Sequence, residues 1–426
     1  MESAVPDQPQ SRISLFFRSL GPGILMASAA VGGSHLVAST KAGAIYGWQL
    51  AALILLVNLF KYPFFRAGVQ YTMGTGLTLV EGYARLGRPY LWLFLFLSVV
   101  SAVINTAALL MFSASLLGYF IPFSLSMASL SIIVLVTCLI ILFAGHYKAL
   151  DTLSKDVMSC HVMSVLTIAT LLAVAIAFGN PVEPVANFES PSPWSIAAIG
   201  FIVVTMGWMP APIEISCLTS AWLKRQSSQQ EVTPRSALFD FNVGYIGTAI
   251  LALVFVSLGA LMLHGAGIEL KSSGVGFSHQ LVGLYASTIG EWSRYLIAVI
   301  AFFCIFGSTI TVIDGYSRVI ADSQRLLRSQ AETDPKATSA IMLAVSLLAL
   351  GIVVFWASAL LPMLDFAMVL AFMTTPFFAL LNYILVSKTD LPEPLAVGRK
   401  LKWLSIAGLI YLFGFLALFI WWKWLM

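Results

Sequence analysis

Residues 21–46 read GPGILMASAAVGGSHLVASTKAGAIY, a stretch apolar enough to cross a membrane but interrupted in its middle by Gly32, Gly33, Ser34 and His35. Two consecutive glycines favour unwinding of a helix, because glycine loses the most backbone entropy there. Unwound backbone inside a bilayer is tolerated only where it is buried in protein or lines a water-filled cavity. The stretch therefore predicts a discontinuous helix that builds a site near the bilayer midplane.

A second apolar stretch, residues 194–222, is interrupted by the sequence Met209-Pro210-Ala211-Pro212. Two prolines so close together do not fit the interior of an unbroken helix, because each removes a hydrogen-bond donor and clashes with the preceding turn. Two interrupted spans in corresponding positions of two halves are typical of the binding site of a secondary transporter.

The composition is that of an integral membrane protein. The chain has 426 residues, of which 59% are hydrophobic and only 10% are charged, whereas soluble domains carry about 25% charged residues. The sequence shows no nucleotide-binding loop and no arrangement of a nucleophile with a base. We therefore expect neither an enzyme nor an ATP-driven pump, and we expect no cofactor. The basic residues report membrane topology and indicate no nucleic-acid partner.

Apolar segments of about 20 residues, the length that crosses a bilayer, predict eleven spans, near residues 21–45, 48–71, 90–119, 123–144, 151–178, 194–222, 237–264, 291–321, 338–358, 361–386 and 402–422. Most of the 23 Lys and Arg residues, Lys61 among them, are assigned to alternate connecting segments. The positive-inside rule places these segments in the cytoplasm. We therefore expect a cytoplasmic N-terminus and an external C-terminus in the inner membrane of a bacterium.

The two interrupted spans divide the chain into two repeats. We expect a cytoplasmic tail over residues 1–19, a first repeat over 20–186, a second repeat over 187–386, and a linker with the last span over 387–426. Five spans per repeat is an odd number, so the two repeats must have opposite topology in the membrane. Because one chain already contains both repeats, we expect a monomer surrounded by membrane lipid.

The stretch GPGILMASAAVGGSH resembles the first span of the Nramp family of proton-coupled divalent metal transporters, which also opens with GPG, hydrophobic residues and Leu-Met. Met209-Pro210 resembles the Met-Pro motif of that family's sixth span. The resemblance covers most of the chain. It implies an all-α membrane protein of the LeuT-type fold, with two inverted five-helix repeats and an eleventh transmembrane helix. It also implies alternating access and a small ion as substrate, with a coupled proton.

The chain departs from this family at the metal-binding motifs. The family's first-span Asp-Pro-Gly-Asn motif aligns with Gly32, Gly33, Ser34 and His35. The metal-bridging carboxylate is therefore absent. The histidine that follows Met-Pro in the family is Ala211 here, and the proton-linked histidine further along the span aligns with Ser216. Met209, a soft ligand that favours transition metals, is retained.

Glu214 is the ionisable residue that the sequence singles out, because it lies one turn beyond the proline break in an apolar span. A carboxylate is favoured at the N-terminus of a half-helix, and an ionisable residue inside a membrane is by default a functional candidate. The alternative is a carboxylate that caps the broken helix. His35 follows the other break and is a candidate to pair with Glu214, to ligate a metal or to carry a proton. The alternative is a structural histidine.

We expect a cation site at the second break, in which Glu214 supplies the charge and His35 and Met209 are further metal ligands. Backbone carbonyls beside the breaks and nearby hydroxyls complete the predicted site, namely those of Gly32, Gly33, Ser34, Thr205, Met206, Ser216 and Thr374. Two alternatives stay open. The same fold suits an amino acid or another small organic solute, held by N–H groups at a half-helix N-terminus, and it also suits a sensor that transports nothing.

Four further residues are candidates for a gate or a proton relay. Asp314 and Arg318 are four residues apart on the eighth span and should share a helix face, so they form either a structural ion pair or part of a relay. Asp156 and His161 lie in the inner half of the fifth span, where the alternative to a gate is a solvated helix end. Asn105, in the third span, is predicted to make a hydrogen bond between helices.

Overall fold

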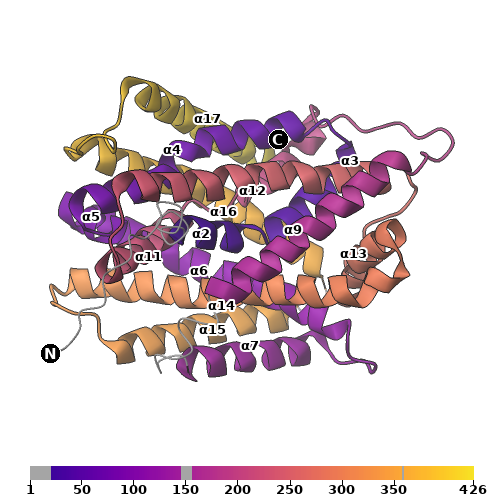
Figure 1. The fold of residues 1–426 in the computed structure, drawn as a ribbon, viewed down its shortest axis with the longest axis horizontal. Helices are drawn as coiled ribbons and strands as arrows, with labels where there is room; N and C mark the ends of the chain where they lie inside the picture. Colours follow the sequence, from indigo (N-terminus) through magenta and orange to yellow (C-terminus); the bar gives the residue numbers. More distant parts are fainter. Residues whose placement is uncertain (1–20, 145–155, 357–358) are drawn as a thin grey trace, which may run out of the picture.

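The computed structural model describes residues 21–144, 156–356 and 359–426, with the backbone alone for residues 156–161. The long helices of this described part run side by side along the long axis of the molecule (Figure 1). Nine of them are long and apolar enough to cross a membrane, and a pair bent by 47° around the first break makes a tenth candidate. The two short helices around the second break complete the series of spans that the sequence predicts.

The order of the elements follows the predicted spans. The first span comprises α2 (Pro22–Ala30), the π-helix η1 (Ser34–Ser39) and α3 (Thr40–Tyr46). The elements that follow it are α4 (Ala51–Thr75), α5 (Leu79–Leu86), α6 (Arg88–Gly118), α7 (Met127–Ala144) and α9 (Asp156–Gly179). The sixth span comprises the 3₁₀-helix η2 (Ile196–Ala198), α10 (Ile199–Gly207) and α11 (Ile215–Gln229). The remaining elements are α12 (Pro234–Met262), α13 (Gly274–Ile289), η3 (Glu291–Ser293), α14 (Arg294–Leu327), α15 (Pro335–Trp356), α16 (Leu360–Lys388) and α17 (Arg399–Trp424).

The first span is held against α12 on both sides of its break. A side chain at Gly23 in α2 would collide with the backbone of Asp240 in α12, and one at Gly43 in α3 would collide with the backbone of Val256. Small residues let helices approach to backbone contact, which drives helix association in a bilayer. The Asp240 carboxylate also accepts hydrogen bonds from the free N–H groups of Gly21 and Gly23, at 3.1 and 2.6 Å. One continuous helix thus fixes both halves of the broken span.

The two ends of the molecule differ in their short helices. Figure 1 shows α5 and α11 at one end and α13 at the other, with α2 in the middle of the bundle between α12 and α14. The chain therefore places its first break deep inside the protein, where the sequence analysis expects the site.

Candidate functional site

The first break is short, and uncharged groups satisfy its backbone. Helix α2 ends at Ala30 and η1 begins at Ser34. The Val31 carbonyl accepts a hydrogen bond from the Cys304 thiol at 3.0 Å, and the Gly32 N–H donates to the Ala30 carbonyl at 2.9 Å. The break is therefore closed by neutral hydrogen bonds, which are much cheaper to bury than charges.

The two glycines of this break are not there for a left-handed backbone. Gly33 has φ −57° and ψ −33°, and the glycines with positive φ in the described part of the chain lie elsewhere. Gly33 is needed because a Cβ there would lie 2.5 Å from Cζ3 of the Trp208 ring. A Cβ at Gly32 would meet Ser308 Oγ at 3.2 Å. The sequence thus located the break correctly, but the requirement for Gly33 is the approach of a ring from the second break.

His35 is held by structural hydrogen bonds. It is completely buried. Its Nε2 lies 2.9 Å from the Thr248 carbonyl of α12, and since a carbonyl only accepts, Nε2 is the donor. Its Nδ1 lies 2.7 Å from Ser34 Oγ. Both ring nitrogens are engaged, so the predicted pairing of His35 with Glu214 does not form, and metal ligation by His35 would require one of these bonds to break.

The second break is filled by a lysine from α4. The carbonyls of Met206 and Gly207, at the C-terminal end of α10, accept hydrogen bonds from Lys61 Nζ at 2.7 and 3.1 Å. Lys61 is 0% exposed. Its assignment to a cytoplasmic segment is therefore wrong, because the ammonium lies inside the bundle, where the dipole of α10 favours positive charge. The Met206 carbonyl, predicted as a cation ligand, already has this lysine as its partner. The available signal was the single charge within the apolar run of residues 51–65.

Glu214 lies at the other side of this break, directly before α11, and is 2% exposed. Its side chain does not cap α11, so the capping interpretation is wrong. Oε1 accepts a hydrogen bond from the Tyr316 hydroxyl of α14 at 2.9 Å, while Oε2 has no well-formed hydrogen bond within the described part of the chain. The Ser101 hydroxyl of α6 lies near the same carboxyl group. One carboxylate oxygen of a buried glutamate is therefore unsatisfied beside the break.

A chain of hydrogen bonds connects Glu214 to the middle of the break. The Tyr316 hydroxyl accepts a hydrogen bond from Asn105 Nδ2 at 3.0 Å, and Asn105 Oδ1 accepts one from Trp208 Nε1 at 3.2 Å. Asn105 thus makes the interhelical bonds that the sequence predicts. Tyr316 and Trp208 were missed, because an aromatic residue in a span gives no sign in the sequence of whether it faces lipid or a site.

A cavity of about 40 Å³ lies between the two breaks. Most of its walls are apolar, and its polar lining residues are Ser34, Asn105, Trp208 and Tyr316. A buried water needs roughly 10–15 Å³ of such volume, so the cavity admits an ion with a few waters. Sites that enclose organic ligands measure about 300–1,000 Å³, which is far larger.

The other residues of the predicted site are buried but do not line this cavity. The Met206 and Met209 side chains are completely buried. The hydroxyls of Thr205 and Thr374 donate to carbonyls one turn earlier in their own helices. Ser216 Oγ accepts a hydrogen bond from an asparagine of α16 at 3.0 Å. Of the predicted site residues, Gly33 and Ser34 line the cavity. Glu214 reaches it only through its hydrogen bond with Tyr316, and the other predicted residues pack around it.

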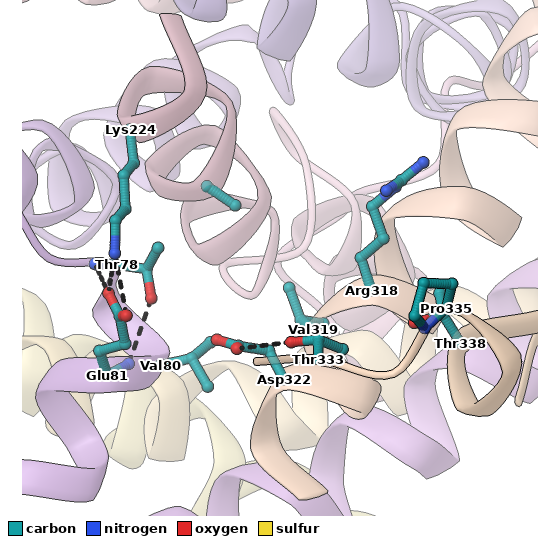
Figure 2. Close-up of a pocket in the computed structure, with 11 residues that line it drawn as sticks. Thr78, Val80, Glu81, Lys224, Arg318, Val319, Asp322, Thr333, Pro335 and Thr338 are labelled. Atoms are coloured by element: carbon teal, nitrogen blue, oxygen red, sulfur yellow. Dashed lines mark hydrogen bonds and ion pairs between the residues drawn. The ribbon is translucent and has the colours of Figure 1, made fainter. Parts of the chain in front are cut away.

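A second, larger pocket of about 370 Å³ opens where α5, α11 and α14 meet (Figure 2). In Figure 2, Lys224 reaches toward Glu81, and Arg318 lies on the other side of the pocket. Lys224 Nζ is 2.7 Å from Glu81 Oε2. Arg318 is paired with Asp314 at 2.9 Å, as their spacing predicts. A role of this pair in gating stays a prediction.

An ion pair joins two helices at the opposite end of the molecule. Lys41 of α3 and Asp365 of α16 form an ion pair of 2.7 Å. The cavity beside Lys41, toward α13, measures only about 10 Å³. The predicted inner-gate residues Asp156 and His161 belong to α9, but their side chains lie outside the described residues.

Two split spans, a cavity between their breaks and a series of long apolar helices define an integral multi-pass membrane protein with the architecture of secondary transporters. The natural resistance-associated macrophage protein-like (Nramp) family matches residues 23–422. The chain belongs to this family, which confirms the resemblance drawn from the two motifs. A protein of Pasteurella multocida, described as uncharacterized, is 51% identical over 407 residues, 95% of this chain and 92% of that protein.

Solved structures show the same fold. A variant of the manganese transporter of Eremococcus coleocola matches with a TM-score of 0.73 at 14% identity, covering 98% of this chain and 89% of that one. MhsT in complex with L-phenylalanine matches with a TM-score of 0.59 at 14% identity, covering 97% of this chain and 100% of that one. The predicted LeuT-type fold is therefore confirmed.

Proposed function

We propose that this protein is a secondary transporter for a metal cation, working by alternating access at the cavity between its two breaks. The observation that carries the proposal is the buried Oε2 of Glu214, which has no well-formed hydrogen bond among the described residues. Burying a carboxylate oxygen without a partner costs free energy. Glu214 does not line the cavity itself, so a cation would recover that cost by moving past the Tyr316 hydroxyl that separates the two. Residues 32–35 at the first break contain no carboxylate, so we infer that Glu214 supplies the negative charge of the site.

The ligands that support this proposal are mostly neutral. Asn105 and Ser34 offer oxygen atoms in the cavity wall, and Met209 would favour a soft transition metal if its sulfur turned to the site. Among the described residues, no group of three or more His, Cys, Asp and Glu residues could hold a metal ion. With a single carboxylate we expect weak binding, since affinity for hard divalent ions rises with the number of charged ligands.

The size of the cavity favours an ion over the organic solute of the alternative hypothesis. In the proposed cycle, the repeats over residues 20–186 and 187–386 have inverted topology and move against each other around the site. The end with the pocket of about 370 Å³ would face the cytoplasm of a bacterium, together with the N-terminus. The Lys41–Asp365 end would face outward. We propose that a single chain suffices, and that a proton accompanies the ion.

Calorimetric titration tests the metal site. The purified protein is titrated with Mn²⁺, Mg²⁺ and Ca²⁺, and the same titrations are repeated with Glu214→Gln. Glu291→Gln is the matched control, because Glu291 is a solvent-exposed glutamate, with 72% of its side chain accessible. We expect one of the metals to bind the wild type and Glu291→Gln equally, and to bind Glu214→Gln at least tenfold more weakly. Failure of the folded wild type to bind any of the three would overturn the proposal. The alternative of an organic solute would then be tested by measuring uptake of amino acids and small zwitterions into proteoliposomes.

A further inference from the structure

Lys61 is the second buried charge at the α10–α11 break, and the proposed metal site does not use it. Lysines normally bury their stems and keep the ammonium in water, yet this one is 0% exposed. Within the described part of the chain, no carboxylate is in ion-pair contact with its Nζ, whose hydrogen bonds go to the Met206 and Gly207 carbonyls. Glu214 stands on the other side of the same break, directly before α11. A charge buried at such cost calls for a specific reason.

The two carbonyls have the properties of a cation site. They are the last carbonyls of a half-helix, where the helix dipole places partial negative charge. The Met206 carbonyl also accepts backbone hydrogen bonds from the N–H groups that follow it, that of Met209 at 3.4 Å. Backbone carbonyls of this kind bind bare monovalent cations, both in channel filters and at the C-terminal ends of broken transporter helices. The lysine ammonium is itself a compact, strongly hydrated point charge on a flexible stem. Its distances of 2.7 and 3.1 Å to the two oxygens are those of direct coordination without a water between.

The carbonyls are held in place independently of Lys61. A Cβ at Gly207 would collide with the backbone carbonyl of Met368 in α16, so the end of α10 lies in backbone contact with a neighbouring helix. The Met206 side chain is also fixed, since its sulfur accepts a hydrogen bond from the Tyr411 hydroxyl of α17 at 2.9 Å. Removal of the lysine would therefore leave two oriented carbonyls and an uncompensated Glu214.

We propose that Lys61 is a built-in cation, whose ammonium occupies a carbonyl site at the end of α10 that would otherwise hold a small monovalent cation such as K⁺ or Na⁺. The lysine makes this half of the break independent of bound salt and closes it to inorganic cations. The inference goes beyond the proposed metal transport, because it concerns an occupied site and holds whatever the protein carries.

Thermal unfolding of the purified full chain in detergent tests this inference. Lys61→Ala is compared with the wild type in KCl, NaCl and choline chloride at one ionic strength, since choline is too large for the vacated space. We expect the Tm of Lys61→Ala to be several degrees higher in KCl or NaCl than in choline chloride, and that of the wild type to be the same in all three salts. Lys61→Met is the matched control, because its uncharged side chain fills the space, and it should show no dependence on the cation.

Equal unfolding of folded Lys61→Ala in all three salts would overturn the inference, and so would an equal cation effect in the wild type. If Lys61→Ala does not fold, the double variant Lys61→Ala/Glu214→Gln removes both buried charges and is compared in the same salts. A cation-dependent Tm in the double variant supports the carbonyl site, and its absence overturns it. The metal titration of the wild type is unaffected by these outcomes, so failure of one proposal is distinguishable from failure of the other.

Discussion

The two broken spans satisfy the backbone groups freed at their breaks with different kinds of partner. At the first break, the freed backbone groups are bonded by a thiol, a hydroxyl and other backbone groups, all of them uncharged. At the second break, the freed carbonyls are bonded by the Lys61 ammonium, and the buried Glu214 stands at the start of the following helix. One break is a neutral bend in a helix, and the other is a charged gap between two helices.

The two breaks differ in the cost of burying the groups that they contain. A neutral hydrogen-bonded bend is cheap to bury, whereas each buried charge costs several kcal/mol unless it is compensated. The first break packs its Gly33 against the Trp208 ring. The second break contains two buried ionisable residues, Lys61 and Glu214. Oε2 of Glu214 has no well-formed hydrogen bond among the described residues. Ionisable residues buried within membrane spans are candidates for function.

The largest effects should come from the charges of the second break. We expect Lys61→Met to lower the free energy of unfolding by about 3–5 kcal/mol, because it removes two hydrogen bonds from a charged donor, which are worth about 1.5–3 kcal/mol each. Glu214→Gln keeps the shape of the side chain and should cost less. The double variant should lose clearly less than the sum of the two. Cys304→Ala removes one neutral hydrogen bond at the first break and should cost about 1 kcal/mol. Unfolding in detergent measures all four, and additivity of the two charge variants to within about 0.5 kcal/mol would show that the charges are independent.

A smaller effect tests the neutral break. We expect Gly33→Ala to destabilise the protein by about 1–3 kcal/mol, the usual cost of overpacking, because its Cβ would lie 2.5 Å from the Trp208 ring. Gly32→Ala is the control at the neighbouring position, where the nearest atom is Ser308 Oγ at 3.2 Å, and it should cost less. Thermal unfolding of both variants decides the point. Equal losses would mean that backbone flexibility, rather than the ring, requires the glycines.

The smallest effect concerns the ion pair at the α5 end of the molecule. Burial tends to raise the pKa of Glu81, but hydrogen bonds from Lys224 and the Thr78 N–H outweigh it and hold the pKa below its usual value of 4.5. A carboxyl whose pKa is lower in the folded state stabilises the protein above its unfolded pKa, and this contribution is lost as the pH falls through the folded pKa. For a partly exposed pair we expect less than about 1 kcal/mol.

Unfolding of the wild type and Glu81→Gln at pH 7 and at decreasing pH below 4.5 measures this contribution. The difference between the two proteins should be largest at pH 7 and should shrink on acidification. Lys224→Ala, which removes the partner, should make the stability depend less on pH in this range. A difference between wild type and Glu81→Gln that grows on acidification would contradict the assigned direction of the pKa shift.

The sequence alone determined the membrane class, the order of the spans, the positions of both breaks and the family, and it singled out Glu214 as a charge within a span. Each of these follows from local properties: the length of apolar runs, the backbone chemistry of proline and the cost of a charge in a span. Asp314 and Arg318 were paired correctly for the same reason, since four residues on one helix fix their relative positions.

Only the tertiary structure decided which side chains meet. His35 turned toward α12 and bonds Thr248, Lys61 entered the bundle from α4, and Asn105, Tyr316 and Trp208 joined in one chain of hydrogen bonds. These contacts depend on how each helix is rotated and how closely it approaches its neighbours. Rotation and approach are set by packing between residues more than a hundred positions apart, such as Gly33 with Trp208 and Gly207 with Met368. Hydropathy along a single span contains no information about them.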